Sequence, residues 1–203
     1  MYYFSLQKGI RMNHLYKTIR ILTLAPILAS ISLLLLFQLR PDIFPNGVMD
    51  LGWSLFFLGV LPLTAYPLQP FLPPFKNQGR EGQRHLAILM AVIGYLGGFI
   101  YTRIMHTPWN LLLIFLEYLI SGALILLFNK VLKIKASGHA CGVAGPLFYL
   151  CYFIGYKALW AIPVVFLVYW SSLRMKRHTW SELIWGTFIP LLSLTILLVA
   201  GTT

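Results

Sequence analysis

The chain has 203 residues, of which 59% are hydrophobic and only 10% are charged, and its mean hydropathy is +0.77. Soluble globular domains have about 25% charged residues, so this composition excludes one and indicates an integral membrane protein. The formal net charge is +11, but the cations form clusters between apolar runs. That arrangement favours lipid headgroups or an anionic substrate, not nucleic acid, as their partners.

The apolar runs predict an all-α, polytopic transmembrane bundle of about six to seven spans. Residues 1–18 carry cations among aromatic and aliphatic residues, which is typical of a basic segment lying at the membrane interface. Residues 19–203 are expected to form one transmembrane helical domain. Its predicted spans are residues 19–39, 51–68, 86–104, 109–128, 139–156, 158–173 and 182–200. The first run is too long for a signal-peptide core and lacks a cleavage site, so we expect it to stay as an anchor.

Cationic segments separate these spans at residues 75–85, 129–138 and 174–181. Two spans lie between successive cationic segments, and two more precede the first, so all three are expected on one side of the membrane. Together with the N-terminal segment, that side has thirteen of the sixteen Lys and Arg residues. The positive-inside rule assigns it to the cytoplasm. We expect an integral protein of a prokaryotic cell membrane.

Two histidines adjoin the cationic segments. His139 follows Ser137 and Gly138 at a predicted helix start, where free backbone N–H groups favour anions. His178 lies four residues before Glu182, so the carboxylate reaches one ring nitrogen if the last helix begins just after His178. One histidine can attack phosphorus while the other protonates the departing oxygen, with cations stabilising the charge. The pattern predicts phosphoryl-transfer chemistry at the membrane surface.

These residues resemble the type 2 phosphatidic acid phosphatase family, the membrane branch of the vanadium-haloperoxidase superfamily, at positions 76–84, 135–139 and 171–182. The family's motifs are Lys, six residues and Arg-Pro; Pro-Ser-Gly-His; and Ser-Arg, five residues, His, three residues and Asp. The resemblance implies that His178 forms a phosphohistidine, that Glu182 orients it, and that His139 is the general acid. The residues assigned to phosphate binding are Lys76, Arg80, Arg84, Lys135, Ser137, Gly138, Arg174 and Arg177.

The chain departs from the family pattern in all three motifs. Ala136 stands where the second motif has proline. Ser171 fits the Ser of the third motif, but Ser172 stands where the family has Arg, so Arg174 or Arg177 is expected to supply that charge. The first segment has no Arg-Pro pair and is one residue longer than the pattern. The family does not usually place two spans between its first and second motifs.

The expected function is hydrolysis, or transfer, of the phosphate of a membrane lipid such as a polyprenyl pyrophosphate or phosphatidic acid, without metal or cofactor. Three alternatives remain. A zinc site could use His139, His178 and Glu182, although the surrounding cations repel a metal ion. The chain could be a transporter or binding protein for anionic lipids with Glu117 as a gate, or a catalytically inactive relative. Glu117 lies in mid-span and should face the bundle interior, and the two cysteines are expected to be packing residues.

Overall fold

The computed structural model describes residues 15, 16 and 18–201, and this part of the chain is almost entirely helical. No strand occurs in it, which confirms the expected all-α class. Almost all of the predicted interfacial segment, residues 1–18, lies outside the described residues.

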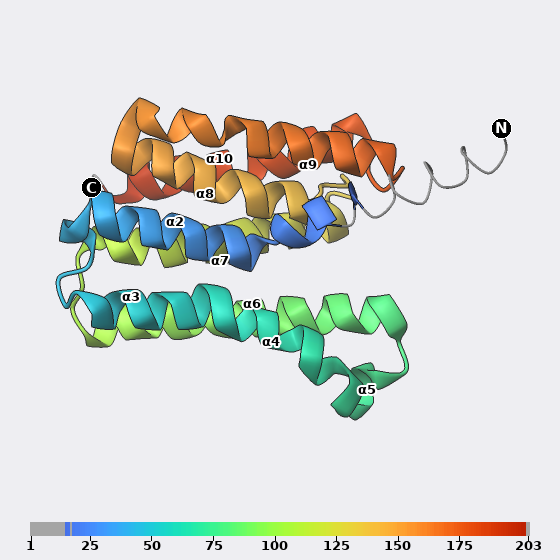
Figure 1. Cartoon of the computed structure of the whole chain (residues 1–203), viewed down its shortest axis with the longest axis horizontal. Coiled ribbons are helices and arrows are strands. Elements are labelled where there is room, and N and C mark those ends of the chain that lie inside the picture. Colours follow the sequence, from blue (N-terminus) through green and yellow to red (C-terminus); the bar gives the residue numbers. More distant parts are fainter. Residues whose placement is uncertain (1–14, 17, 202–203) are drawn as a thin grey trace, which may run out of the picture.

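Five helical stretches of the described chain are long and apolar enough to cross a membrane. They are Val48–Phe71, Gly79–Ile104, Trp109–Val131, Gly138–Arg174 and Trp180–Gly201, and a shorter apolar helix, α2, covers Ala25–Leu39. The stretch Gly138–Arg174 contains α8 (Gly138–Ile154), the 3₁₀ segment η5 (Gly155–Ala161) and α9 (Ile162–Arg174). Gly155 has a φ of 64°, a left-handed value that favours glycine, and the chain reverses there so that α8 and α9 run antiparallel (Figure 1). The predicted turn between the fifth and sixth spans is therefore present.

The first predicted span, residues 19–39, is not one continuous helix. A helical segment ends at Leu22, the chain turns at Thr23, and α2 begins at Ala25 with Pro26 in its first turn. Proline has no N–H to donate and is tolerated at that position, where the group would be unpaired in any case. This break leaves Arg20 outside α2, at the end of the bundle.

The second and third spans, in contrast, begin earlier than predicted. The second consists of α3 (Val48–Leu55), the π-helical segment η2 (Phe56–Val60) and α4 (Leu61–Leu68), and the short segments η3 (Gln69–Phe71) and α5 (Pro73–Lys76) follow it. Helix α6 (Gly79–Ile104) starts inside the predicted cationic loop, so Arg80 and Arg84 lie on a helix. The two arginines are one turn apart and face the same side.

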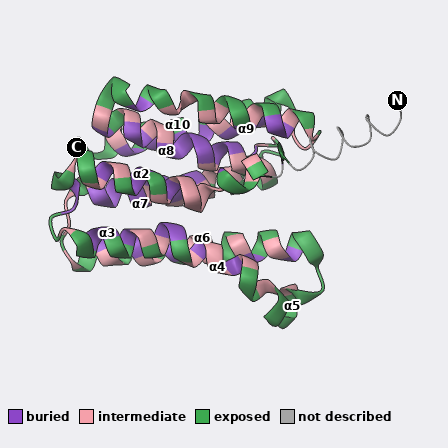
Figure 2. Ribbon diagram, in the orientation of Figure 1, coloured by how far each residue is buried: buried purple, intermediate pink, exposed green. Residues whose placement is uncertain are grey.

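The helices run along the long axis of the molecule and are stacked in three layers (Figure 1). One layer holds α8, α9 and α10 (Trp180–Gly201), the middle one α2 and α7 (Trp109–Leu126), and the third α3, α4 and α6. Buried side chains line the faces between neighbouring helices (Figure 2), among them Leu33, Phe115 and Tyr149. Helices α6 and α7 approach closely at Gly98, where a Cβ atom would overlap the Phe115 ring. Small residues have this role in membrane bundles because close backbone packing replaces the hydrophobic effect there.

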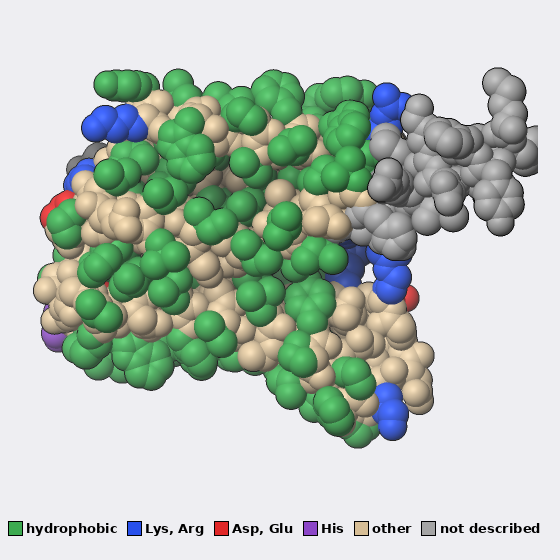
Figure 3. Space-filling model, viewed as in Figure 1, with side chains coloured by type: hydrophobic (Ala, Val, Ile, Leu, Met, Phe, Trp, Pro, Cys, Tyr) green, Lys and Arg blue, Asp and Glu red, His purple; other side chains and the backbone are tan. Residues whose placement is uncertain are grey.

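Charged side chains gather at the two ends of the molecule, and the long face between them is largely hydrophobic (Figure 3). Phe166 and Ile184, for example, expose more than half of their surface. An apolar band of this kind suits hydrocarbon better than water. The loops that precede α6, α8 and α10 all lie at one end (Figure 1), as the parity of the spans predicted.

Candidate functional site

The turn between α9 and α10 holds the first half of the site. His178 Nδ1 lies 2.7 Å from Glu182 Oε2, and both side chains are more than three-quarters buried. The pair has this geometry because α10 begins at Trp180: the Thr179 hydroxyl accepts a hydrogen bond from the Glu182 backbone N–H at 3.3 Å and caps the helix. With Nδ1 held by the carboxylate, the lone pair of His178 is directed to Nε2. That nitrogen has no hydrogen-bond partner among the described residues.

The start of α8 is joined directly to this turn. The Ser137 N–H donates to the Glu182 carbonyl oxygen at 2.8 Å, and the Ser137 hydroxyl caps α8 by accepting from the Ala140 N–H at 3.3 Å. Gly186 on α10 permits this contact, because a Cβ atom there would overlap the Ser137 carbonyl oxygen. Ser137 is therefore buried and its polar groups are engaged within the fold. The N–H groups of Gly138 and His139, the first two of α8, have no acceptor among the described residues.

Asn129 fixes the loop that leads into α8. It lies in the π-helical segment η4 (Leu127–Val131), and its side chain pairs with both backbone groups of Ala136. The Ala136 N–H donates to Oδ1 at 3.0 Å, and Nδ2 donates to the Ala136 carbonyl at 3.1 Å. The loop backbone is thus held one residue before Ser137.

His139 is oriented by Thr23, from the break that precedes α2. The Thr23 hydroxyl donates its one hydrogen to the Ile19 carbonyl at 2.7 Å and lies 3.2 Å from His139 Nε2. Since that hydrogen is already engaged, Thr23 accepts from His139, and the imidazole proton is on Nε2. The His139 ring interacts electrostatically with both Arg20 and His178, which places the two histidines in one electrostatic neighbourhood.

Four arginines converge beside the histidines. Partial burial, and the positive charges of Arg177, Arg80 and Arg84, lower the pKa of the Arg20 guanidinium. Burial and the charge of Arg80 likewise lower the pKa of Arg177. None of the four makes an ion pair with a carboxylate among the described residues, where the ion pairs are Arg40–Asp42 and His178–Glu182. Cations that converge without a counter-ion form an anion-binding site, and Figure 3 shows Lys and Arg side chains in the notch at this end of the molecule.

The structure thus brings together most of the predicted site. The predicted residues that meet here are His139, His178, Glu182, Ser137, Gly138, Arg80, Arg84 and Arg177. Three others are not tied to it: Lys76 ends α5, which projects from the bundle, and Lys135 and Arg174 make no hydrogen bond or ion pair with either histidine in the described part of the chain. Their assignment to phosphate binding stays a prediction.

Sequence reasoning missed Arg20, Thr23 and Asn129. The sequence pattern places Arg20 only among the cations of the N-terminal side. Pro26 provided a signal, because a proline in that run predicts a helix start and thus a polar break before it. Asn129 offered no signal, since its partners depend on the path of the loop.

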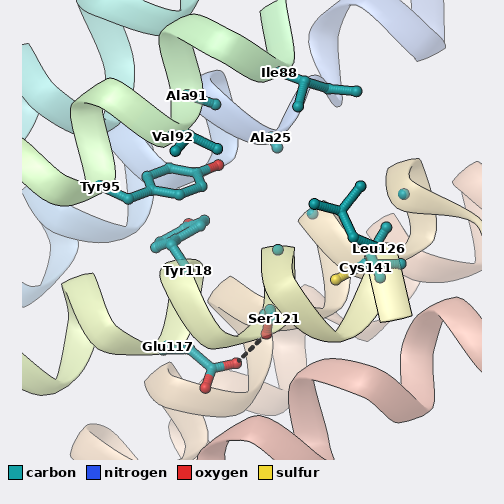
Figure 4. Close-up of a pocket in the computed structure, with 15 residues that line it drawn as sticks. Ala25, Ile88, Ala91, Val92, Tyr95, Glu117, Tyr118, Ser121, Leu126 and Cys141 are labelled. Atoms are coloured by element: carbon teal, nitrogen blue, oxygen red, sulfur yellow. Dashed lines mark hydrogen bonds between the residues drawn. The ribbon is translucent and has the colours of Figure 1, made fainter. Parts of the chain in front are cut away.

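Glu117 faces the bundle interior, as expected, and is about 1% exposed. Its Oε1 accepts a hydrogen bond from Ser121 at 3.2 Å, as Figure 4 shows, and the Ser193 hydroxyl donates to its backbone carbonyl at 3.3 Å. Its Oε2 has no partner among the described residues, and no cation pairs with it there. The side chain of Glu117 is thus bonded within α7, and its backbone carbonyl links α7 to α10.

The two histidines do not belong to a metal-ligand set, because no group of three His, Cys, Asp or Glu side chains in the described residues could hold a metal ion. What the geometry provides at one end of the bundle is a carboxylate-oriented histidine, a second histidine and four arginines that form no ion pair within the described part of the chain. No protein-family model, curated protein or solved structure matches the chain.

Proposed function

We propose that the protein is an integral membrane phosphatase that hydrolyses the phosphate monoester or pyrophosphate of a membrane lipid through a phosphohistidine. The observation that carries this proposal is a cluster of four arginines, with no carboxylate partner among the described residues, at the end of the bundle where Glu182 holds Nδ1 of His178. A phosphoryl group needs positioned positive charge around its oxygens and a nucleophile in line with the leaving group.

The first step forms a bond between His178 Nε2 and phosphorus and breaks the bond from phosphorus to the leaving oxygen. Glu182 holds the Nδ1 proton and stabilises the positive charge that develops on the ring. The arginines stabilise the phosphoryl oxygens. His139 acts in its protonated form and gives its Nδ1 proton to the departing oxygen, which leaves as an alcohol or as a lipid monophosphate, while its Nε2 proton stays hydrogen-bonded to Thr23.

The second step returns the enzyme to its starting state. Water attacks phosphorus, the phosphorus–nitrogen bond breaks, and His139 accepts the proton that the water loses. Inorganic phosphate leaves and both histidines regain their initial protonation. Acceptor alcohols in place of water would give phosphotransfer by the same steps.

The positions of the cations support a cytoplasmic site. Most of the Lys and Arg of the described chain lie in or beside the loops before α6, α8 and α10, at the end that carries the two histidines. Cations of this kind in short loops mark the cytoplasmic side. The substrate's phosphate would therefore be presented from the inner leaflet.

The test is phosphate release by the purified protein from polyprenyl pyrophosphate, polyprenyl phosphate and phosphatidic acid. We expect release from at least one of them, a fall of at least 100-fold in His178→Ala and of 10²–10⁴-fold in His139→Ala. Acid quenching should trap an acid-labile phosphoryl group on the wild-type chain that His178→Ala lacks.

The matched control is His106→Asn. His106 is exposed in the turn between α6 and α7, at the opposite end, and its φ of 50° is a value that Asn tolerates. This variant should retain full activity. Retention of activity by His178→Ala would exclude the covalent mechanism, and release from none of the lipids by the wild type would exclude the function.

A further inference from the structure

A cavity of about 180 Å³ lies inside the bundle between α2, α6, α7 and α8 (Figure 4). Its lining is largely apolar and includes Ile88 and Val92 of α6 and Leu126 of α7. Glu117 and Ser121, which are hydrogen-bonded to each other, also line it. Small residues line it from all four helices: Ala25, Ala91, Gly122, Gly138, Gly142 and Gly145. A space with this lining suits hydrocarbon better than a polar ligand.

The cavity approaches the candidate site at the start of α8. Gly138 lines it and immediately precedes His139, so one end of the cavity adjoins the general acid. The other end reaches Tyr95 and Tyr118, where α6 faces α7 in the bundle interior (Figure 4). A molecule with its phosphate at the arginines can extend an apolar chain along α8 between these two ends.

The glycine at position 122 keeps the cavity from being filled by a side chain. Glycine is unfavourable in a helix interior, and close helix packing is its usual justification. Here no atom lies within 4 Å of the position that a Cβ at Gly122 would take, in contrast to Gly98, where the Phe115 ring blocks it. Nothing packs against Gly122, so the effect of its missing side chain is to keep the cavity open.

We infer that this cavity binds one hydrocarbon chain of the substrate while the phosphate attached to that chain lies at the two-histidine site. The inference rests on the proposed function and narrows its substrate class to lipids whose phosphate is joined directly to a chain end, such as alkyl or polyprenyl phosphates. Cavities of about 150 Å³ hold benzene. A space of 180 Å³ therefore receives roughly the first six carbons of the chain.

The experiment measures phosphate release from n-alkyl phosphates of increasing chain length, from methyl to decyl, below their micellar concentrations. Each methylene that enters the cavity from water should lower KM about fourfold, and the effect should level off after about six carbons. Gly122→Phe fills the cavity and should abolish the fall in KM, measured relative to methyl phosphate, beyond about two carbons. Gly122→Leu should be intermediate.

Gly52→Phe is the matched control, because Gly52 also has open space at its Cβ but lies exposed on α3. It should reproduce the wild-type chain-length profile. A wild-type profile in Gly122→Phe would overturn the inference while leaving the proposed function intact.

A binding arm separates the inference from catalysis. An alkylphosphonate with a diazirine at its sixth carbon cannot be hydrolysed, and on irradiation it should label α6 and α7 near Tyr95 and Tyr118. Loss of that labelling in Gly122→Phe supports the chain site even if no phosphate is released from any substrate. Labelling spread over exposed lipid-facing residues, unchanged in Gly122→Phe, would refute it.

Discussion

At the scale of single residues, the two histidines differ in the partner that fixes each ring. His178 is held through Nδ1 by a carboxylate that stabilises its charged form, as a nucleophile requires. His139 is held through Nε2 by a neutral hydroxyl that cannot stabilise positive charge to the same degree. A histidine in that environment gives up a proton readily, which suits the acid of the first step.

Thr23 should be a positioning residue for His139. Thr23→Val keeps the shape of the side chain but removes the acceptor for the Nε2 proton, so the ring loses its fixed orientation. We expect kcat for lipid-phosphate hydrolysis to fall about tenfold, which corresponds to about 1.4 kcal/mol of transition-state stabilisation.

Thr23→Ser is the control, since it retains the hydroxyl, and it should restore most of the lost activity. KM should change little in either variant because Thr23 does not contact the phosphate. Equal loss in the Ser and Val variants would show that Thr23 acts by packing and not through its hydrogen bond.

The residues of the site differ in how far sequence could predict them. The spacing of His178 and Glu182 sets their contact once α10 begins after Thr179, so a local pattern was sufficient. The choice among cations was not local. Lys76 and Arg80 are neighbours in the same basic stretch, but α6 directs Arg80 to the site while α5 carries Lys76 away from the bundle.

At the scale of the helices, the contact of α10 with the start of α8 joins the two halves of the site. At this contact the Ser137 N–H donates to the Glu182 carbonyl oxygen, and the missing side chain of Gly186 lets the Ser137 carbonyl oxygen approach α10 closely. Because Ser137 precedes His139 by two residues and Glu182 holds His178, displacement of either helix would change the separation of the two imidazoles.

Gly186→Ala should therefore impair both stability and activity. The added Cβ meets a backbone carbonyl, which cannot rotate away as a side chain can, so α10 must shift. Overpacking of this kind costs about 1–3 kcal/mol. We expect a lower Tm in detergent and a loss of activity greater than tenfold.

Gly145→Ala tests the same helix pair without the clash. A Cβ at Gly145 would lie 3.7 Å from Pro190, an ordinary contact, and alanine favours the helix. This variant should keep or raise the Tm. If Gly186→Ala behaved in the same way, the close approach of α10 to Ser137 would not be a constraint.

The helices themselves were largely predictable because hydropathy reports burial in lipid, and lipid requires helices. The reversal at Gly155 could be predicted, because the apolar run that contains it is too long for one membrane crossing. The break at Thr23 did not, because residues 19–39 have the length and composition of a single span. Only Pro26 marks it, and proline is compatible with helix interiors in membranes.

At the scale of the whole molecule, one end of the bundle concentrates positive charge that no described carboxylate neutralises. Arg20, Arg80, Arg84 and Arg177 repel one another, so the empty site opposes folding to some extent. A bound anion would remove this repulsion. The charge that binds substrate is therefore a cost to stability that the ligand offsets.

Inorganic phosphate, the expected product, should raise the Tm of the purified protein. A ligand that binds only the folded state stabilises it by about 2.7 kcal/mol at a concentration 100 times its Kd. Sodium chloride at equal ionic strength screens the arginines without binding between them, so its effect should be smaller.

Arg80→Gln should raise the Tm in phosphate-free buffer, because one repelling charge is gone, and should reduce the further gain from phosphate. Arg103→Gln removes a charge from the exposed, opposite end of α6 and should change neither quantity. Equal responses of the Arg80 and Arg103 variants to phosphate would mean that the anion acts on the overall charge of the protein and not at the cluster.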